Sequence, residues 1–316
     1  MKQFHNLSGQ NLLRHELIES HFRNLGFDCV VSDSVNLRQQ IILLFSPRSK
    51  VVFHFLELYT FSFVAFFSEL KFRVGLSLFR PLSLAKLLVS FSILFAKVML
   101  FKLIIKNNSI IILSSELRKE FVEEIGFINR VIVLRNKPVY SRDDIINVDT
   151  DKVERIKRLV LTGNLNNRPQ FLDLCRKLEN IDIIIYCYGI SNSDKRWVAT
   201  QGFSNVAVLD SIPSHDVPHV LSTSSHAICL YSESSYNQRY SASSKIFEIL
   251  FWGAIPIVNS NLGLLSELNK LNAQYINIQD LIVEDMLGES LEHDLYRSEA
   301  CLFSSEMVNL DLKGNV

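Results

Sequence analysis

Three side chains near residue 245 have the types and the spacing to hold a charged ligand. On a helix that starts near Ser244, the spacing i, i+1, i+4 places Ser244, Lys245 and Glu248 together at its N-terminal end. Backbone N–H groups and the helix dipole favour a phosphate there, and Lys245 adds charge. A carboxylate one turn further in suits sugar hydroxyls instead. The set therefore fits the diphosphate and ribose of a nucleotide, unless Glu248 only complements the dipole and Lys245 is solvated.

A strand, a helix and a second strand must position these residues. The sequence predicts a strand at Ala227–Tyr231, a polar loop, a helix at about Lys245–Trp252 closed by Gly253, and a strand at Ile255–Val258. In open α/β sheets, ligands bind where the C-terminal end of a strand meets the N-terminus of the next helix. The polar loop is expected at that place.

The run SASSKIFEILFWGAIPIVNSNLGLLSEL resembles a stretch of GT-B glycosyltransferases of the family-four type (glycosyl transferases group 1). The residues in register with the family pattern are Lys245, Phe247, Glu248, Gly253, Pro256, Val258, Ser260, Gly263 and Glu267. The resemblance implies that Glu248 grips the donor ribose and that the helix N-terminus, with Ser244 and Lys245, receives the pyrophosphate. A second family glutamate would fall at Tyr240. That sugar contact is therefore missing or comes from Glu233 or Asn237, and Asn237 and Tyr240 are assigned to the donor pocket.

Residues upstream resemble the start of the donor-binding domain. The run KRLVLTGNLNNRPQFLDLCRKL is similar to its opening strand, glycine turn and helix, with Gly163 at the end of the strand. Arg168 occupies roughly the place of a basic residue that contacts the diphosphate in the family, although the lysine that usually follows is absent. Two later runs, IDIIIYCYG and NVAVLDSIPSHDVPHVLSTSSHAICLY, resemble further strands of this domain.

The N-terminal half resembles the acceptor-side domain of the same family. LSGQNLLRHELIESHFRNLGFDCVV is similar to its glycine loop, first helix and second strand, while the preceding strand is cut to MKQFHN, so that it is very short or the chain has lost its beginning. SKVVFHFLELY resembles a strand with histidine motifs and makes His54 a candidate for the donor pocket; a structural role for this lone histidine is the alternative. SIIILSSELRKEF and RVIVLRNKPVY resemble the end of the domain, with Asn136 at the hinge.

Length and composition agree with two domains. The chain has 316 residues, of which 48% are hydrophobic and 21% charged, which is enough for two buried cores. We expect an α/β protein with the GT-B architecture, in which two Rossmann-like domains with mainly parallel sheets, residues 1–140 and 141–316, face each other across a cleft. The tail, residues 298–316, is short and weak for the helix that in this family returns to the first domain.

Charge and cysteines exclude some function classes. Lys+Arg 33 and Asp+Glu 33 balance, so there is no global field to attract nucleic acid. The five cysteines are odd in number and have no CxxC or Cys/His ligand spacing, which favours a reducing, cytosolic setting. No signal peptide is apparent.

The region 82–105 is apolar and long, as a membrane-spanning helix would be. Lys86, Lys97 and Lys102 interrupt it, and the uncharged run Leu87–Ala96 would span roughly 15 Å as a helix, about half of the hydrocarbon core. We therefore expect no crossing. The basic, apolar residues 71–106 suit the surface of an anionic membrane, or else form a buried helix whose lysines point outward. The family resemblance favours membrane contact, because many such enzymes reach lipid-linked acceptors.

The resemblance implies transfer of a sugar from a UDP- or GDP-sugar to a hydroxyl of a saccharide or lipid-linked acceptor. It further implies retention of configuration, no required metal or other cofactor, and a role in surface polysaccharide or glycolipid synthesis, in the cytoplasm or on the inner face of the cell membrane. Lys245, Arg168 and His54 are the candidate catalytic residues, and Glu248, Ser244, Gly163, Asn237 and Tyr240 the candidate donor-binding ones. The alternative is a non-catalytic GT-B-like subunit that binds a partner enzyme or a membrane. A GT-B epimerase is a third, weaker possibility.

Overall fold

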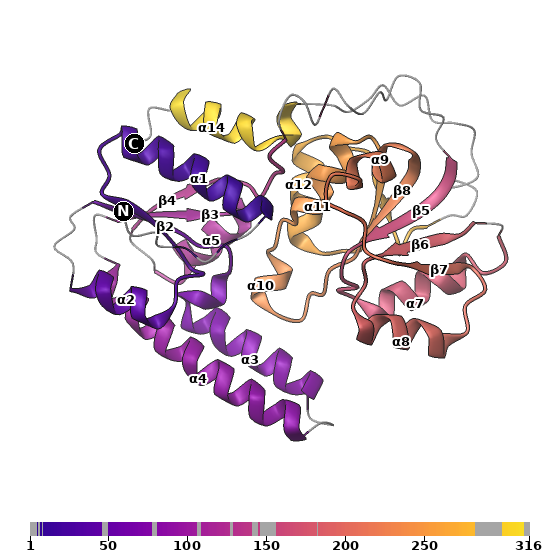
Figure 1. The fold of residues 1–316 in the computed structure, drawn as a ribbon, viewed down its shortest axis with the longest axis horizontal. Coiled ribbons are helices and arrows are strands. Elements are labelled where there is room, and N and C mark those ends of the chain that lie inside the picture. Colours follow the sequence, from indigo (N-terminus) through magenta and orange to yellow (C-terminus); the bar gives the residue numbers. More distant parts are fainter. Residues whose placement is uncertain are drawn as a thin grey trace. The chain divides into compact units, whose positions relative to one another are not determined.

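The chain divides into two compact units in the computed structural model (Figure 1). The structure describes residues 5, 7, 9–45, 50–77, 81–105, 109–126, 129–140, 145, 156–181, 183–281 and 299–312. Unit 1 comprises Met1–Val139, Glu233–Ala242 and Glu306–Val316; unit 2 comprises Tyr140–Ser232 and Ser243–Ser305. Two segments from the C-terminal half of the sequence, 233–242 and 306–316, thus group with the N-terminal unit. The abbreviated first strand expected at MKQFHN falls almost entirely outside the described residues.

Unit 1 is built on a parallel four-stranded sheet of order β1-β2-β3-β4. The strands are β1 (Cys29–Ser32), β2 (Val51–His54), β3 (Ile110–Leu113) and β4 (Arg130–Val133). The helices are α1 (Gly9–Asn24), α2 (Leu37–Leu44), α3 (Phe63–Ser77), α4 (Pro81–Ile104) and α5 (Glu116–Glu124), with a 3-10 turn at Leu58–Thr60. Every residue of the first three strands is buried, which explains their continuous apolar sequences, since a parallel sheet covered on both faces has no polar side.

Helices α3 and α4 pack against each other and extend from the sheet of unit 1 as a hairpin (Figure 1). Helix α4 has 24 residues and therefore a length of about 36 Å. Its part Ala85–Ile104 is long and apolar enough to cross a membrane, judged by length and composition alone. Only 22% of this apolar stretch is buried inside the protein. The helix is therefore not the buried core helix that was one of the two alternatives from the sequence.

Unit 2 holds a parallel six-stranded sheet of order β7-β6-β5-β8-β9-β10. The strands are β5 (Ile156–Thr162), β6 (Ile185–Tyr188), β7 (Val206–Leu209), β8 (Ser224–Cys229), β9 (Ile255–Val258) and β10 (Ile276–Asn277). The helices are α7 (Arg168–Lys177), α8 (Asn192–Gln201), α9 (Val217–Ser222), α11 (Ser244–Phe251) and α12 (Leu262–Lys270). Counted along the chain, this order is 3-2-1-4-5-6, the Rossmann arrangement, so the predicted class is confirmed.

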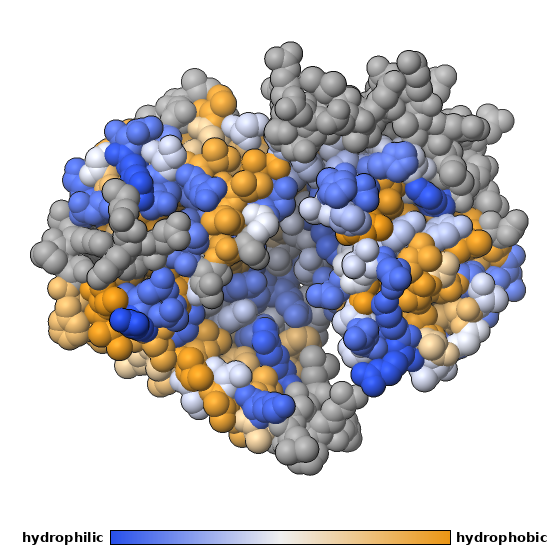
Figure 2. Space-filling model, viewed as in Figure 1, coloured by the Kyte–Doolittle hydropathy of each residue, from blue (hydrophilic) through white to orange (hydrophobic). Residues whose placement is uncertain are grey.

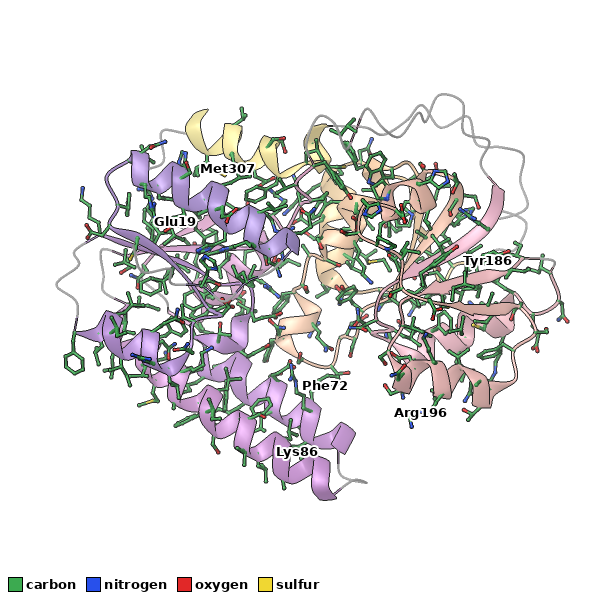
Figure 3. All side chains as sticks on the ribbon, viewed as in Figure 1. Glu19, Phe72, Lys86, Tyr186, Arg196 and Met307 are labelled. Carbon is green, nitrogen blue, oxygen red and sulfur yellow. The ribbon has the colours of Figure 1, made fainter. Side chains whose placement is uncertain are left out.

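The C-terminal helix α14 (Phe303–Leu312) corrects the expectation of a tail too weak to return to the first domain. From Glu306 onward it packs within unit 1 (Figure 3, where Met307 is labelled). The buried Glu306 carboxylate lies 2.5 Å from Lys137 Nζ and 3.5 Å from Arg135 Nη1. A buried ion pair of this kind supplies an attachment that the apolar content of the segment did not reveal.

Candidate functional site

The strand order of unit 2 creates the place for a ligand. From β5 the chain builds outward to β6 and β7, then returns to the other side of β5 as β8. The carboxyl ends of β5 and β8 are neighbours, and the segments that follow them lead away to opposite faces, which is the switch point at which ligands bind in open α/β sheets. Residues Gly163, Ser244, Lys245 and Glu248, with Tyr140, gather at this edge and are called the switch-point site below.

Helix α11 has its N-terminus at this site, and local interactions define where the helix begins and ends. The Ser243 hydroxyl caps the helix by accepting a hydrogen bond from the Lys245 amide at 3.2 Å, and it lies 2.8 Å from the Tyr231 hydroxyl. Gly253, with φ +78°, ends it. Ser244 is the first helical residue, and its amide has no acceptor among the described residues. The side chains of Ile246, Phe247, Ile249 and Leu250 are buried and anchor the helix.

Lys245 reaches from α11 to the end of β5. Its Nζ donates a hydrogen bond to the Thr162 carbonyl and would lie 3.2 Å from a Cβ on Gly163. Gly163 adopts φ +75°, a left-handed conformation that suits glycine, and any side chain there would also crowd the ammonium. Burial lowers the pKa of Lys245, and Cys229 and Glu248 partly offset that effect. An anionic ligand would stabilise the charged form of this poorly solvated ammonium beside the glycine turn.

Glu248 lies one turn behind Lys245 and is held by Tyr140. The Tyr140 hydroxyl donates to Glu248 Oε1 at 2.5 Å, and its ring packs on Phe251 and Trp252 with centroid distances of 5.6 and 5.3 Å. An ionised carboxylate can accept about four hydrogen bonds, so Glu248 retains capacity for ligand hydroxyls while Tyr140 fixes its direction. No sequence pattern indicates Tyr140, because its partner is 108 residues away.

Arg168 lies at the same edge of the sheet but is engaged elsewhere. It starts α7, after the Gly163 turn, and its guanidinium pairs with Asp194 at 2.8 Å and lies 5.5 Å from the Trp197 ring centroid. Both partners belong to α8. No described contact joins Arg168 to Lys245 or Glu248, and its proposed contact with a diphosphate stays a prediction.

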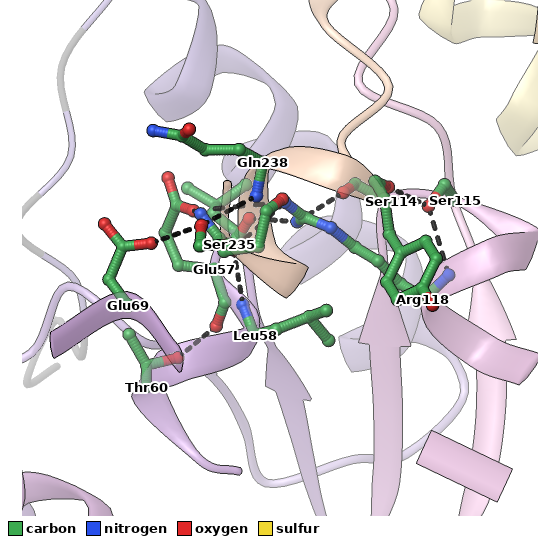
Figure 4. Close-up of polar contacts among 12 residues, drawn as sticks. Glu57, Leu58, Thr60, Glu69, Ser114, Ser115, Arg118, Ser235 and Gln238 are labelled. Atoms are coloured by element: carbon green, nitrogen blue, oxygen red, sulfur yellow. Dashed lines mark hydrogen bonds and ion pairs between the residues drawn. The ribbon is translucent and has the colours of Figure 1, made fainter. Parts of the chain in front are cut away.

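The structure groups Asn237 and Tyr240 with unit 1, whereas the switch-point residues belong to unit 2. Asn237 belongs to the short helix α10 (Tyr236–Arg239) and is buried. Its partners Glu57, Leu58 and Arg118 are labelled in Figure 4. Its Oδ1 accepts from the Leu58 amide at 2.9 Å and from Arg118 Nη2 at 3.2 Å, and its Nδ2 donates to Glu57. The Tyr240 ring packs on Phe121, with centroids 5.7 Å apart. Their assignment to the donor pocket is an untested prediction, and this structure gives both residues a structural environment.

Replacement of Asn237 by alanine should destabilise unit 1. The change removes acceptors from the Arg118 guanidinium, which is 2% exposed, and from the Leu58 amide, so we expect a loss of about 2–3 kcal/mol in the free energy of unfolding. Urea denaturation measures it. Asn192→Ala, at an exposed position of unit 2, is the matched control and should change little. Equal stability of the two variants would refute the structural role of Asn237.

His54 ends β2 in unit 1 and faces another histidine. Its Nδ1 lies 3.4 Å from Nδ1 of His15 on α1, and both rings are buried. Burial lowers the pKa of His54 well below its ordinary value and that of His15 to about 4. Both imidazoles are thus neutral at pH 7, which suits a packed pair between helix and sheet. The role of His54 in a donor pocket stays a prediction.

Solved structures with a similar fold are glycosyltransferases. HepE of Anabaena, solved in complex with UDP-glucose, is 13% identical in sequence, with a TM-score of 0.54. The match covers 99% of this chain and 85% of HepE. The GtfA/B complex is 11% identical with a TM-score of 0.53 over 95% of this chain, and AviGT4, involved in avilamycin A biosynthesis, is 11% identical with a TM-score of 0.50 over 65%. This chain spans 66% of AviGT4 and 60% of the GtfA/B chain. No family model and no curated protein matches the sequence.

These likenesses, together with two Rossmann-like units of parallel strands, show that the chain has the GT-B fold. At such low identity they show the fold alone, and the chemistry depends on the residues of the switch-point site.

Proposed function

We propose that the protein is a glycosyltransferase that moves a sugar from a nucleotide-sugar to an acceptor hydroxyl. The observation that carries this proposal is the placement of Lys245 at the Gly163 turn, with Glu248 one turn behind it, at the switch point of unit 2. A cation and a helix N-terminus suit a diphosphate, and a directed carboxylate suits ribose hydroxyls. The solved complex of HepE with UDP-glucose supports a UDP-sugar as donor.

The proposed chemistry requires the site to stabilise a leaving group. When the bond between the sugar and the diphosphate breaks, negative charge grows on the departing diphosphate. Lys245 and the N-terminal end of α11 would stabilise that charge, and they act most strongly where water is excluded. Glu248 would hold the ribose without attacking the sugar. We further propose retention of configuration without a required metal.

A face of α4 supports membrane contact by unit 1. Its apolar side chains Leu88, Val89, Ile93, Phe95, Met99 and Leu103 are each at least 40% exposed. At 3.6 residues per turn they form one continuous stripe, with Lys86 and Lys102 on its two borders. Figure 2 shows apolar surface at the lower left, over α2 and α4. The opposite face of α4, with Val98 and Phe101, is packed into the unit.

An apolar stripe bordered by lysines favours a helix that lies in the surface of an anionic membrane rather than one that crosses it. The packed face of α4 supports the same choice, because crossing would expose it to lipid. We propose that the protein acts in the cytoplasm, peripherally on the inner face of the membrane, in the synthesis of a surface polysaccharide or glycolipid.

A second candidate is a non-catalytic GT-B subunit that binds a partner enzyme or a membrane. The observation in its favour is that Asn237 and Tyr240, the residues expected to contact the sugar, have structural partners within unit 1: Asn237 binds Arg118, and Tyr240 packs on Phe121.

Product formation from a panel of UDP- and GDP-sugars discriminates the two candidates. Thermal stabilisation should first select the donor, since a ligand at 100 times its dissociation constant adds about 2.7 kcal/mol of stability. Transfer from that donor to an acceptor supports the enzyme. Stabilisation without transfer to any acceptor, or hydrolysis alone, would favour the subunit or another GT-B activity such as epimerisation.

A further inference from the structure

Unit 1 contains a groove of about 820 Å³ between α3 and the segment that includes α10. Val64, Phe67 and Phe72 form its apolar lining, and Phe72 is labelled on α3 in Figure 3. Lys71 and Arg239 contribute two cations from opposite walls, and Glu233 contributes one acid. The groove is thus apolar along α3 and carries a net positive charge.

The walls of the groove are fixed by hydrogen bonds. The Ser235 hydroxyl donates to the buried Glu69 carboxylate at 2.7 Å, and the Tyr236 amide donates to the Ser68 hydroxyl at 3.3 Å (Figure 4 shows the first of these). The Tyr236 ring also stacks on Phe121, with centroids 5.1 Å apart. These contacts attach the segment to α3 and keep the groove in place.

The two cations of the groove are available to a ligand. Lys71 and Arg239 are exposed, and their charged side-chain groups have no ion-pair or hydrogen-bond partner within the described part of the chain. Arg73, two residues after Lys71 in α3, is by contrast paired with Glu69 at 2.6 Å. Two unpaired cations from different elements suit a phosphate or diphosphate, which each can contact from its own side.

The apolar lining argues that this phosphate carries a hydrocarbon chain. Phe67 and Val64 are 56% and 47% exposed, a cost that a free sugar phosphate would not relieve. Helix α3 also packs against α4, whose exposed apolar stripe lies in the same unit. A lipid with an anionic head would cover the apolar side chains and neutralise the cations together.

We propose that this groove binds the phosphate and the first part of the lipid chain of a lipid-linked acceptor, with Lys71 and Arg239 on the phosphate. The inference rests on the proposed function, since it names the acceptor class of the same enzyme. It separates the two substrates by unit: the donor is held by the switch-point residues of unit 2, and the acceptor carrier by side chains of unit 1.

Co-sedimentation with vesicles tests the proposal. The full chain is mixed with phosphatidylcholine vesicles that contain a polyprenyl phosphate, with vesicles of equal surface charge that contain phosphatidylglycerol instead, and with phosphatidylcholine alone. We expect a preference for polyprenyl phosphate over phosphatidylglycerol. In Lys71→Gln/Arg239→Gln that preference should be lost, with affinity lower by about ten- to thirtyfold.

Lys50→Gln is the matched control, because Lys50 is exposed in unit 1 but precedes β2, at the amino edge of the sheet. Calorimetry with UDP should give the same affinity in the double variant and the wild type, so that loss of the lipid preference with intact UDP binding isolates this inference. Equal binding to both anionic vesicles, or an unchanged double variant, would overturn it. Absence of UDP binding in the wild type would instead count against the proposed function.

Discussion

Lys245→Met should lower kcat for sugar transfer by about 10²–10³, the usual loss when one stabilising group for a developing anion is removed. Lys245 supplies a positive charge at the Gly163 turn, where the diphosphate is proposed to leave, and methionine keeps the length of the side chain without the charge. Turnover with the donor selected from the nucleotide-sugar panel measures the effect. A variant that retains full turnover would remove Lys245 from the mechanism.

The stability of Lys245→Met separates this role from a structural one. Burial lowers the pKa of Lys245, which means that the charged form is costly in the folded protein. Replacement by an apolar side chain relieves that cost and offsets the hydrogen bond lost at the Thr162 carbonyl. We therefore expect unchanged or raised thermal stability together with lost turnover. A fall of several kcal/mol in the free energy of unfolding would show that Lys245 mainly supports the fold.

The lowered pKa also predicts the effect of pH on donor binding. As pH rises through the lowered pKa, Lys245 loses its proton and donor affinity falls, at a pH below the ordinary lysine value of about 10.4. In that interval the unfolded chain binds more protons than the folded one, so the free energy of unfolding of the ligand-free protein rises with pH. Lys245→Arg keeps its charge and should not show this alkaline loss of affinity.

Glu248→Ala should weaken binding of the nucleoside diphosphate by about 1.5–3 kcal/mol, roughly 10- to 150-fold in Kd, because ribose hydroxyls lose a charged acceptor. Calorimetry with UDP and GDP measures the change. Glu179→Ala, which removes an exposed acid after α7 in the same unit, is the matched control and should bind as the wild type does.

Tyr140→Phe distinguishes ligand binding by Glu248 from support of the fold. If the only task of Glu248 were to hold Tyr140, loss of the Tyr140 hydroxyl would reproduce the effect of Glu248→Ala. We expect instead that Tyr140→Phe lowers stability and retains most of the affinity for UDP. Identical affinities in Glu248→Ala and the wild type would discard the assignment of Glu248.

Local patterns in the sequence predicted the elements around Lys245 well. The strand at Ile255–Val258 and the end of β5 at Gly163 are confirmed, and α11 begins within one residue of its expected start. These features depend on short-range rules: a glycine for a left-handed turn, and a helix that follows a strand. Ser243 could have been recognised as well, since a serine directly before a helix is a typical cap.

Long-range contacts are the part that the sequence could not provide. The segment around Asn237 packs in unit 1 through Arg118, 119 residues away, and nothing near either residue indicates the pairing. The ion pair between Arg168 and Asp194 and the attachment of Glu306 to Lys137 have the same character. Each depends on a charged partner that only the folded chain brings close. Each therefore gives a residue or segment surroundings that differ from those expected from the sequence.

Hydrogen–deuterium exchange of the full chain with and without saturating UDP shows whether the diphosphate binds at the switch-point site. If the switch-point site holds the diphosphate, UDP should slow exchange of the amides from Gly163 to Asn166 and of those at the start of α11, from Ser244 to Ile246. Lys245→Met should weaken this protection. Protection by UDP that is confined to other segments, with these two turns unaffected, would show that the diphosphate does not bind at the switch-point site.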